Sequence, residues 1–450
     1  MSSTAISYTP GSAPTNKKWT FSAWIKRSIL GTDQTIFEGR QNGSNLSRIT
    51  FRGGSATNQD SLQLYSENSG TTNVQLQTAR KFRDVNGWYH IVTTVDTTLS
   101  TEADRVKIYV NGVRETSFLT SNYPAQEYSG WWIGIGPNVT QVIGSDTVSG
   151  SEKFSGIMSH INYTIGYAYQ ASTFGSIDTT TGEWKINTSP SVTYGATGFF
   201  ILKDGNSLTD QSGNGKNFTL GAGTLTKTED NPSNVFATMN PLVKTPNGTY
   251  SNGNTQFNGG SAHRTAYGTL AFSTGKYYWE AKATGGTKYT IGLSDVENQS
   301  AYQQVAGTNL IVGNQANSYI SGDAIGWYST EINKNGSAVA SGLTAVGTND
   351  ILRVAVDADA GKLYYAIGAT WRVANSTTFN ASSNDTTFTT GRYYVPACSN
   401  ENCGWKFNFG NGYFGTDAVA SAGTNALGNG IFEYDVPTGF TALSTKGLNL

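Results

Sequence analysis

Alternating apolar and polar residues recur in short runs through the first half of the chain. In residues 19–25 every second position is apolar, which predicts a strand with one buried face. That face carries Trp19, Phe21, Ala23 and Ile25. Residues 88–95 and 154–163 predict two further strands. Residues 105–110 alternate in the same way and lead into Asn111-Gly112, a pair that tolerates positive φ and favours a tight hairpin turn.

The same period returns in the second half, after a stretch that lacks it. Residues 204–247 are weakly apolar and rich in turn-forming residues, so we interpret them as an irregular connector with room for one or two strands. Strands are predicted again after this connector, at residues 276–283, 289–293, 351–356, 362–366 and 405–409. This spacing, without helical periods between the strands, predicts antiparallel sandwiches. We expect one domain over residues 1–203 and a second over residues 248–450.

The composition agrees with an all-β chain and argues against one class of partner. Gly counts 53 and aromatic residues reach 12%, which suits short strands joined by tight turns. Only 14% of the residues are charged, with 30 Lys and Arg against 31 Asp and Glu. Proteins that bind nucleic acid carry a basic patch or a high pI, so we expect no nucleic-acid partner.

The sequence shows neither a membrane segment nor a disulfide framework. No apolar stretch is long enough to cross a membrane, so membrane insertion is not expected. The N-terminus lacks the basic start and apolar run of a signal peptide, which predicts a protein that acts where it is made or leaves the cell by lysis. Cys398 and Cys403 are too few for a disulfide-rich secreted domain, and we favour a pair of thiols over a hairpin disulfide.

The order of the strand motifs resembles two known families. The first half resembles the concanavalin A-like, laminin G-type jelly roll in residues 19–25 (WTFSAWI), 87–92 (GWYHIV), 105–112 (RVKIYVNG) and 154–156 (FSG). The second half resembles a SPRY-type sandwich in residues 275–280 (GKYYWE), 289–293 (YTIGL), 351–357 (ILRVAVD) and 405–410 (WKFNFG). The resemblance implies an all-β fold of two antiparallel concanavalin A-like jelly-roll β-sandwiches in tandem.

Further segments resemble phage tail and virion proteins that join a laminin G-like module to a SPRY-like one. These segments are residues 210–215 (DQSGNG), 230–236 (DNPSNVF) and 430–440 (GIFEYDVPTGF). The resemblance implies a bacteriophage virion component that contacts other virion proteins and forms a symmetric homo-oligomer such as a trimer. Fibre proteins usually begin with an anchoring segment, whereas the first strand predicted here begins near Trp19. We therefore expect a compact subunit: a short tail fibre, a knob, or a capsid fibre or decoration.

The sequence shows no motif that predicts an enzyme. Glycoside hydrolysis needs two carboxylates across the scissile bond, which jelly-roll glycanases supply from a Glu-x-Asp-x-x-Glu strand. The nearest match, Glu433-Tyr-Asp435, is followed by Pro437 and lacks the third acid. No nucleophile elbow accompanies the histidines. These are scattered along the chain as His90, His160 and His263.

Calcium is the cofactor that the sequence leaves open, with no cofactor as the alternative. Asp204, Asn206 and Asp210 offer oxygen ligands within one loop, and laminin G-type sandwiches often hold a hard cation at a loop rim. The loop lacks the distal Glu of an EF-hand. Asp and Asn also serve as turn formers in such loops.

Glycan binding is the function that we expect from the loops of the first domain. Sugars bind with an apolar face over an aromatic ring, while amide and carboxylate groups bond their hydroxyls. The aromatic residues of one Gly- and Asn-rich region have this chemistry, namely Tyr123, Tyr128, Trp131 and Trp132. Each of them also suits the core of a sandwich or the packing between subunits.

Together these features predict a virion structural protein, without enzymatic activity, that binds host cell-surface polysaccharide. Multivalent display would raise the affinity of weak single contacts. Three alternatives stay open: a purely structural adaptor or decoration protein, a polysaccharide depolymerase, and a secreted lectin or adhesin. The missing signal peptide disfavours the last of these. Apolar patches on flat sheet faces would favour assembly, and patches in a loop cleft would favour ligand binding.

Overall fold

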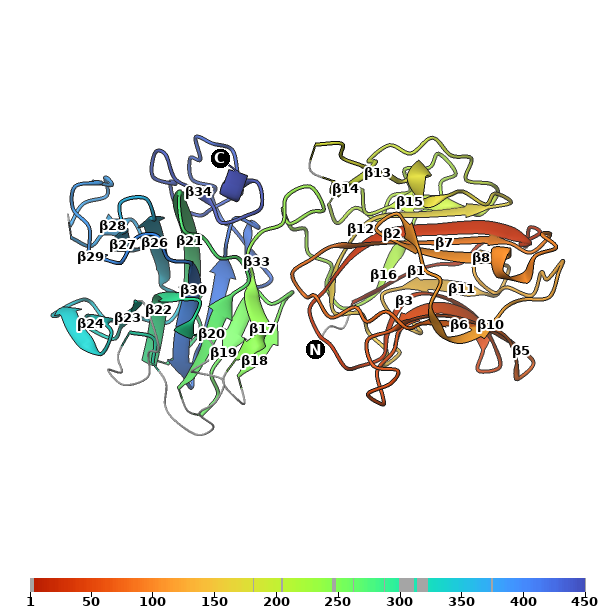
Figure 1. The fold of residues 1–450 in the computed structure, drawn as a ribbon, viewed down its shortest axis with the longest axis horizontal. Helices are drawn as coiled ribbons and strands as arrows, with labels where there is room; N and C mark the ends of the chain where they lie inside the picture. The colour runs from red at the N-terminus through yellow and green to blue at the C-terminus, as the bar shows by residue number, and fades with distance from the viewer. Residues whose placement is uncertain are drawn as a thin grey trace. The chain divides into compact units, whose positions relative to one another are not determined.

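The computed structural model describes residues 4–180, 182–203, 205–244, 248–261, 263–286, 288–298, 311–313, 323–373 and 375–449. The chain forms two compact units, Met1–Lys227 and Thr228–Leu450, and each is a β-sandwich of almost wholly antiparallel strands (Figure 1). The helical elements with described bounds are short 3-10 turns: η1 (Glu102–Asp104), η2 (Ala171–Thr173) and η3 (Gly447–Asn449). No helix in the described ranges is long and apolar enough to span a membrane. The predicted all-β fold with tandem sandwiches is confirmed.

The first unit contains an eight-stranded sheet packed on a six-stranded sheet. In spatial order, the larger sheet consists of β10 (Phe118–Asn122), β6 (Thr71–Thr78), β5 (Leu62–Asn68), β4 (Asn45–Phe51), β3 (Gln34–Asn42), β11 (Thr140–Ile143), β1 (Ala5–Tyr8) and β16 (Thr219–Ala222). The smaller sheet consists of β15 (Phe199–Ile201), β12 (Gly156–Ile165), β2 (Lys18–Arg27), β7 (Tyr89–Asp96), β8 (Val106–Val110) and β9 (Val113–Arg114). A separate hairpin is formed by β13 (Gly175–Ile177) and β14 (Trp184–Ile186).

The core of the first unit lies between its two sheets. The apolar face predicted for residues 19–25 is fully buried there, which confirms the alternation of β2. The opposite face of this sheet is buried as well, because the hairpin β13–β14 lies over it. The ring of His90 stacks on that of Trp24 at a centroid distance of 4.7 Å, and the ring of Trp184 lies beside it, with centroids 5.9 Å apart. Burial lowers the pKa of His90 to about 3, so its imidazole is neutral at physiological pH.

The second unit is built from a seven-stranded and a nine-stranded sheet. The first consists of β17 (Met239–Lys244), β20 (Arg264–Gly268), β30 (Tyr394–Glu401), β22 (Lys288–Asp295), β23 (Ala324–Tyr328), β24 (Glu331–Lys334) and β25 (Ser337–Ala340). The second consists of β18 (Thr249–Ser251), β19 (Gln256–Asn258), β31 (Gly404–Asn408), β21 (Lys276–Ala283), β26 (Ile351–Asp357), β27 (Lys362–Ile367) and β28 (Thr370–Trp371), with β29 (Thr386–Thr387) on β27 and β34 (Thr441–Ala442) on β21. A small hairpin joins β32 (Tyr413–Phe414) to β33 (Asp417–Ala418).

In the second unit, both faces of the nine-stranded sheet carry buried side chains. Trp279, Trp405 and Phe407 face the core between the sheets, as their alternation predicts. On the opposite face, Tyr278 packs against Phe432 of the C-terminal segment, with ring centroids 5.0 Å apart. The C-terminal segment therefore covers part of the outer face of this sheet. Cys398 and Cys403 are buried thiols that form no disulfide, as favoured from the sequence.

The structure differs from the sequence-based expectation at the edges of the sheets. β1 precedes the strand expected near Trp19 and pairs with β11 and β16. The described part of residues 204–247 contains two strands, within the one or two that the sequence allowed: β16 belongs to the first unit and β17 to the second. Both strands lie at the edge of their sheet and pair on one side only, so they need few apolar residues and give a weak pattern.

The turn between β8 and β9 provides a test of how tightly the hairpin β13–β14 packs on the six-stranded sheet. Gly112 has φ of +79°, and a Cβ built there would lie 2.4 Å from a ring carbon of Trp184. Gly166 has a similar φ of +84°, with no atom within 4 Å of its Cβ position. We predict that Gly112→Ala lowers the free energy of unfolding by about 1–3 kcal/mol more than Gly166→Ala does, because only the former adds a clash to the backbone cost. Denaturant unfolding of both variants measures the difference; equal losses would contradict this packing.

Candidate functional site

Of the four aromatic residues predicted to contact a ligand, Trp131 belongs to the core of the first unit and Tyr123 and Tyr128 pack against that core. Trp131 is fully buried, with its ring edge against Trp19 at a centroid distance of 5.1 Å. Tyr128 packs on Trp131, and its hydroxyl accepts a hydrogen bond of 2.6 Å from Asn68 Nδ2. Trp131 therefore has no ring face open to solvent. The structure brings these two residues together as part of the core.

Trp132 and Tyr123 lie nearer the surface than Trp131. Trp132 is half-buried, and its indole Nε1 donates a hydrogen bond of 3.0 Å to the carbonyl oxygen of Glu67. Tyr123 is half-buried and packs edge-on against Phe118, with centroids 6.4 Å apart. Contact of either residue with a ligand stays a prediction.

The loop predicted to hold calcium is organised by its own backbone. Asp204 lies outside the described residues. Asp210 Oδ1 accepts hydrogen bonds from the amides of Phe200 and Ser212, and its Oδ2 accepts from Ser212 Oγ and the amide of Lys216, at 2.7–2.9 Å. Asn206 donates to the carbonyl oxygen of Leu225 at 3.2 Å. No group of three or more His, Cys, Asp or Glu side chains that could hold a metal occurs in the described ranges.

The groups that most resemble catalytic motifs have structural contacts in this fold. Trp184 Nε1 donates to His90 Nδ1 at 2.9 Å, so the remaining proton of the neutral ring lies on Nε2 and points to Ser22 Oγ, 2.9 Å away. His90 therefore cannot take a proton from Ser22 in this geometry. Asp435 Oδ1 accepts from the amide and hydroxyl of Thr424 at 2.6 and 2.7 Å.

A buried carboxylate that the sequence pattern did not single out lies beneath Glu433. Glu280 of β21 accepts hydrogen bonds from the backbone amides of Glu433 and Tyr434, at 2.8 and 2.9 Å. Burial raises the pKa of Glu280 to about 7, although these two amides oppose the shift. Its position on the outer face of β21 follows from the alternation. Its burial depends on the C-terminal segment, which the local pattern does not reveal.

A strip of hydrogen-bonding side chains crosses the outer face of the eight-stranded sheet. Neighbouring strands place these residues directly opposite one another, and we call the strip the polar sheet face. It consists, from β10 to β3, of Asn122, Gln75, Tyr65, Arg48 and Glu38. Their neighbours in sequence point into the core, for example Leu64, Leu76 and Ile49. Exposure decreases along the strip, from exposed Asn122 to fully buried Glu38.

The centre of the polar sheet face is held in place by its own contacts. Arg48 Nη1 donates to both carboxylate oxygens of Glu152, at 3.1 and 3.0 Å, and the Arg48 guanidinium lies 5.7 Å from the ring centroid of Tyr65. Tyr65 donates its hydroxyl to Glu67 Oε2 at 2.5 Å. The guanidinium of Arg48 therefore lies over the aromatic ring of Tyr65, and the carboxylate of Glu67 is fixed at the hydroxyl of that ring, on a half-buried surface. The sequence predicted aromatic rings and carboxylate groups for sugar binding in a loop, whereas here such groups lie on strands.

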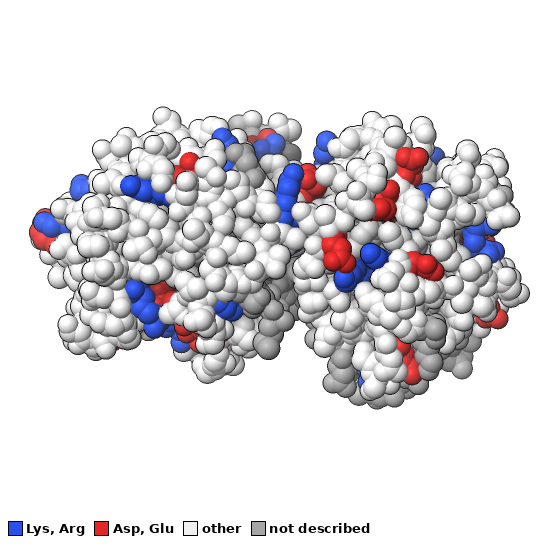
Figure 2. Space-filling model, turned by 180° about the vertical axis from the view of Figure 1, so that it is seen from behind, with Lys and Arg blue, Asp and Glu red and all other residues white. Residues whose placement is uncertain are grey.

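Charged side chains are otherwise few. Figure 2 shows one side of the molecule, on which acidic and basic residues are dispersed over a largely neutral surface. With 14% charged residues in the chain, the polar sheet face and its contacts still gather Glu38, Arg40, Arg48 and Glu152 at one sheet.

Comparisons with known proteins agree with the fold of the first unit. Residues 2–163 match the family model described as the concanavalin A-like lectin/glucanases superfamily, in its laminin G form. The first unit has a concanavalin A-like sandwich fold. Among curated proteins, none matches the chain.

Several solved structures share similarity with parts of the chain. The SPRY domain of human HERC1 is 13% identical, with 38% of this chain and 96% of that domain covered and a TM-score of 0.27. A heptameric SAP-like pentraxin from Limulus polyphemus is 15% identical, with 50% and 90% covered and a TM-score of 0.30. Domain 4 of the arabinanase AbnA from Geobacillus stearothermophilus, in complex with arabinotriose, is 22% identical, with 35% and 64% covered and a TM-score of 0.26.

The buried end of the polar sheet face predicts a pH-dependent stability. Burial raises the pKa of Glu38 to about 7, against the opposing effects of Arg40 and Arg48. The folded state therefore holds this proton more tightly than the unfolded state, so the stabilisation is fully present below about pH 4.5 and is lost as the pH rises through 7. We predict that Glu38→Gln removes this loss. Relative to the wild type, the variant should gain on the order of 1–3 kcal/mol between pH 4.5 and about pH 8.

Denaturant unfolding at both pH values measures this gain. Glu67→Gln is the matched control, because Glu67 lies on the same sheet face and is only half-buried. A difference between Glu38→Gln and the wild type that stays constant with pH would contradict the assignment.

Proposed function

We propose that the protein is a structural component of a bacteriophage particle that binds host-surface glycans without covalent chemistry. The polar sheet face of the first unit carries this proposal. It presents the ring of Tyr65 beside the guanidinium of Arg48 and the carboxylate of Glu67, all on rigid strands. Pyranose rings present apolar C–H faces to aromatic rings and hydroxyls to charged acceptors and donors, so the surface is complementary to them.

The fold and the segments between strands support the same proposal. The family model that matches the first unit describes a superfamily of lectins and glucanases, which groups proteins that handle carbohydrate. Residues 210–215, 230–236 and 430–440 resemble phage virion proteins. The proposal therefore includes a virion location, other virion proteins as partners, and a symmetric homo-oligomer. Several copies on one particle would convert weak single contacts into firm attachment.

Non-covalent binding is proposed in preference to cleavage on the basis of the groups at this surface. Glu38 is buried and in contact with Arg40, and Glu152 is occupied by Arg48 and Thr35. Glycoside hydrolysis requires one carboxyl group free to donate a proton and a second one on the other side of the scissile bond. Glu38 and Glu152 instead hold the side chains of Arg40, Arg48 and Thr35 in place. This arrangement suits a surface that binds a ligand without cleaving it.

Substitution of Tyr65 tests the proposal. We predict that Tyr65→Ala weakens binding to host-surface polysaccharide by at least about tenfold, because stacking and one ordered hydroxyl are lost together. Tyr167→Ala is the matched control, since Tyr167 is 42% exposed and lies in the loop after β12, away from the eight-stranded sheet. Binding of the full-length chain to purified polysaccharide, with a reducing-sugar assay in parallel, gives the readout.

Two results would overturn the proposal. Equal binding by Tyr65→Ala and the wild type would exclude the polar sheet face as the binding surface. Release of reducing sugar by the wild type would replace binding with cleavage.

A further inference from the structure

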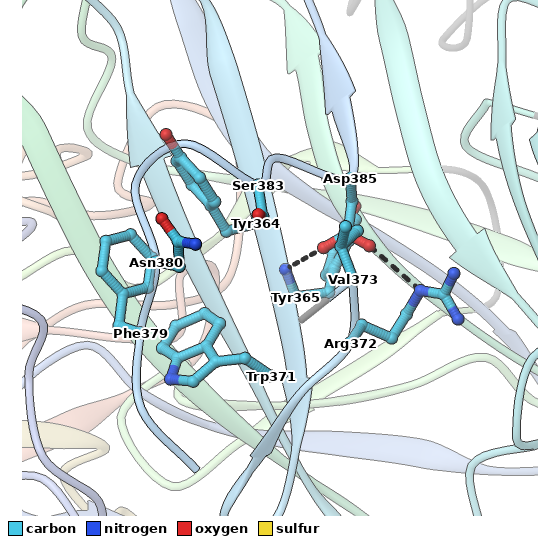
Figure 3. A pocket seen from close by; sticks show the side chains of 9 residues that line it. All are labelled: Tyr364, Tyr365, Trp371, Arg372, Val373, Phe379, Asn380, Ser383 and Asp385. Atoms are coloured by element: carbon cyan, nitrogen blue, oxygen red, sulfur yellow. Dashed lines mark hydrogen bonds and ion pairs between the residues drawn. The ribbon is translucent and has the colours of Figure 1, made fainter. Parts of the chain in front are cut away.

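An aromatic box on the outer face of the second unit is filled by a side chain of the adjacent loop. Its walls are Tyr364 of β27, Trp371 of β28 and Phe440 of the C-terminal segment. The ring of Phe379 lies inside, edge-on to all three walls, with centroids 4.9, 4.8 and 5.3 Å away. Figure 3 shows Phe379, Trp371 and Tyr364 gathered on one side of the hollow at this site. The hollow beside Phe379 has a volume of only about 10 Å³, room for one water molecule.

The loop that carries Phe379 is fixed at its ends. At its base, Asp385 accepts hydrogen bonds from the amide of Tyr365 at 2.7 Å and from Arg372 Nε at 3.0 Å (Figure 3). Residues 377 and 378 and residues 380–382 between these ends are exposed. The carbonyl oxygen of Ala381 accepts a hydrogen bond of 2.9 Å from the hydroxyl of Tyr364. Phe379 thus lies between exposed residues of a loop whose base is held by the Asp385 contacts.

The walls differ from Phe379 in how deeply they are buried. Trp371 and Tyr364 are 5% and 2% exposed, whereas Phe379 is half-buried. When Phe379 moves out, three preformed ring walls become accessible, and the Tyr364 hydroxyl is freed at their rim. Asn380 and Ser383 also line the hollow and add an amide and a hydroxyl. The opened site thus combines an apolar floor with neutral hydrogen-bonding groups.

Two cationic side chains lie against the aromatic rings that form the box, and they bear on the charge of a ligand. The guanidinium of Arg353 lies 4.5 Å from the ring centroid of Trp371, and the ammonium of Lys276 lies 6.0 Å from that of Phe440. Two of the three π-faces therefore already face a cation, which disfavours a cationic ligand through like-charge repulsion. A neutral ring with apolar C–H faces and peripheral hydroxyls fits both the walls and the rim.

We propose that this box binds one neutral pyranose ring of a polysaccharide in the place that Phe379 fills. Phe379 acts as a plug that the ligand displaces. The ligand class rests on the proposed glycan-binding function, but the site lies in the other unit and uses different residues. Because only the unplugged fraction of molecules binds, the apparent affinity is reduced by that fraction, and removal of the Phe379 ring raises it.

Calorimetric titration of the full-length chain with neutral trisaccharides of glucose, galactose and mannose tests the plug. Phe379→Ala should bind at least one of them about tenfold more tightly than the wild type. Thr378→Ala is the matched control, since Thr378 is exposed on the same loop, and it should bind as the wild type does. If Phe379→Ala binds none of the sugars, or binds them no more tightly than the wild type, the box is only a small apolar core and the proposal is overturned.

A second set of variants locates the gain. Adding Trp371→Leu to Phe379→Ala should abolish the tighter binding, with thermal melting as the check on folding. Adding Tyr364→Phe keeps the ring wall and should reduce the gain, because only the rim hydroxyl is lost. Adding Tyr65→Ala should leave the gain intact, so failure of this site is distinguishable from failure of the polar sheet face. A gain that survives Trp371→Leu would place binding elsewhere and overturn the proposal.

Discussion

The alternation of side chains along each strand is the constraint on which the rest of the structure depends. Every strand has two faces, and a sandwich buries only one of them in its central core. The opposite face must be polar enough for water or covered by another part of the chain. In the first unit both solutions occur: the hairpin β13–β14 covers the face that carries Trp24 and His90, while the outer face of the eight-stranded sheet is covered around Glu38 and stays half-buried to exposed from Arg48 to Asn122.

The covered faces account for the unusual polar groups of both units. His90 is neutral because the ring of Trp184 excludes water from it, and Glu280 holds its proton tightly because the C-terminal segment closes over β21. In each case a buried polar group also anchors the covering segment, since Trp184 and the amides of Glu433 and Tyr434 donate to them. The segment that buries each polar group therefore also supplies its hydrogen-bond donor, as buried hydrogen-bonding groups require partners.

The polar sheet face of the first unit has a different consequence for ligand binding. Where the sheet is only partly covered, the alternation places Gln75, Tyr65 and Arg48 in one row, and rigid strands hold them with the precision of the hydrogen-bond register. Such a row needs no conformational change to meet an extended ligand, which keeps the entropic cost of binding low. The aromatic box of the second unit is the opposite case, in which a covering side chain must leave before a ligand enters.

Local alternation was sufficient to predict the long central strands, because β2, β21 and β31 each carry an uninterrupted apolar face. It left room for strands such as β16 and β17 without placing them, because both lie at sheet edges and need little apolar surface. The candidate site was harder to predict, because its residues come from different strands. Tyr65 and Arg48 are separated in sequence and meet only through strand register, whereas Trp131 and Trp132 are neighbours in sequence, and Trp131 is buried in the core. The burial of Glu38 and Glu280 likewise depends on segments far away along the chain.

The central claim is that the polar sheet face of the first unit is a preformed glycan-binding surface. A crystal structure of the chain with an oligosaccharide prepared from the host surface would test it most directly. The account predicts sugar density across β4, β5 and β6, with one ring over Tyr65 and the strands unmoved. Sugar bound only at the rim formed by Tyr123 and Trp132, with the sheet face empty, would contradict it.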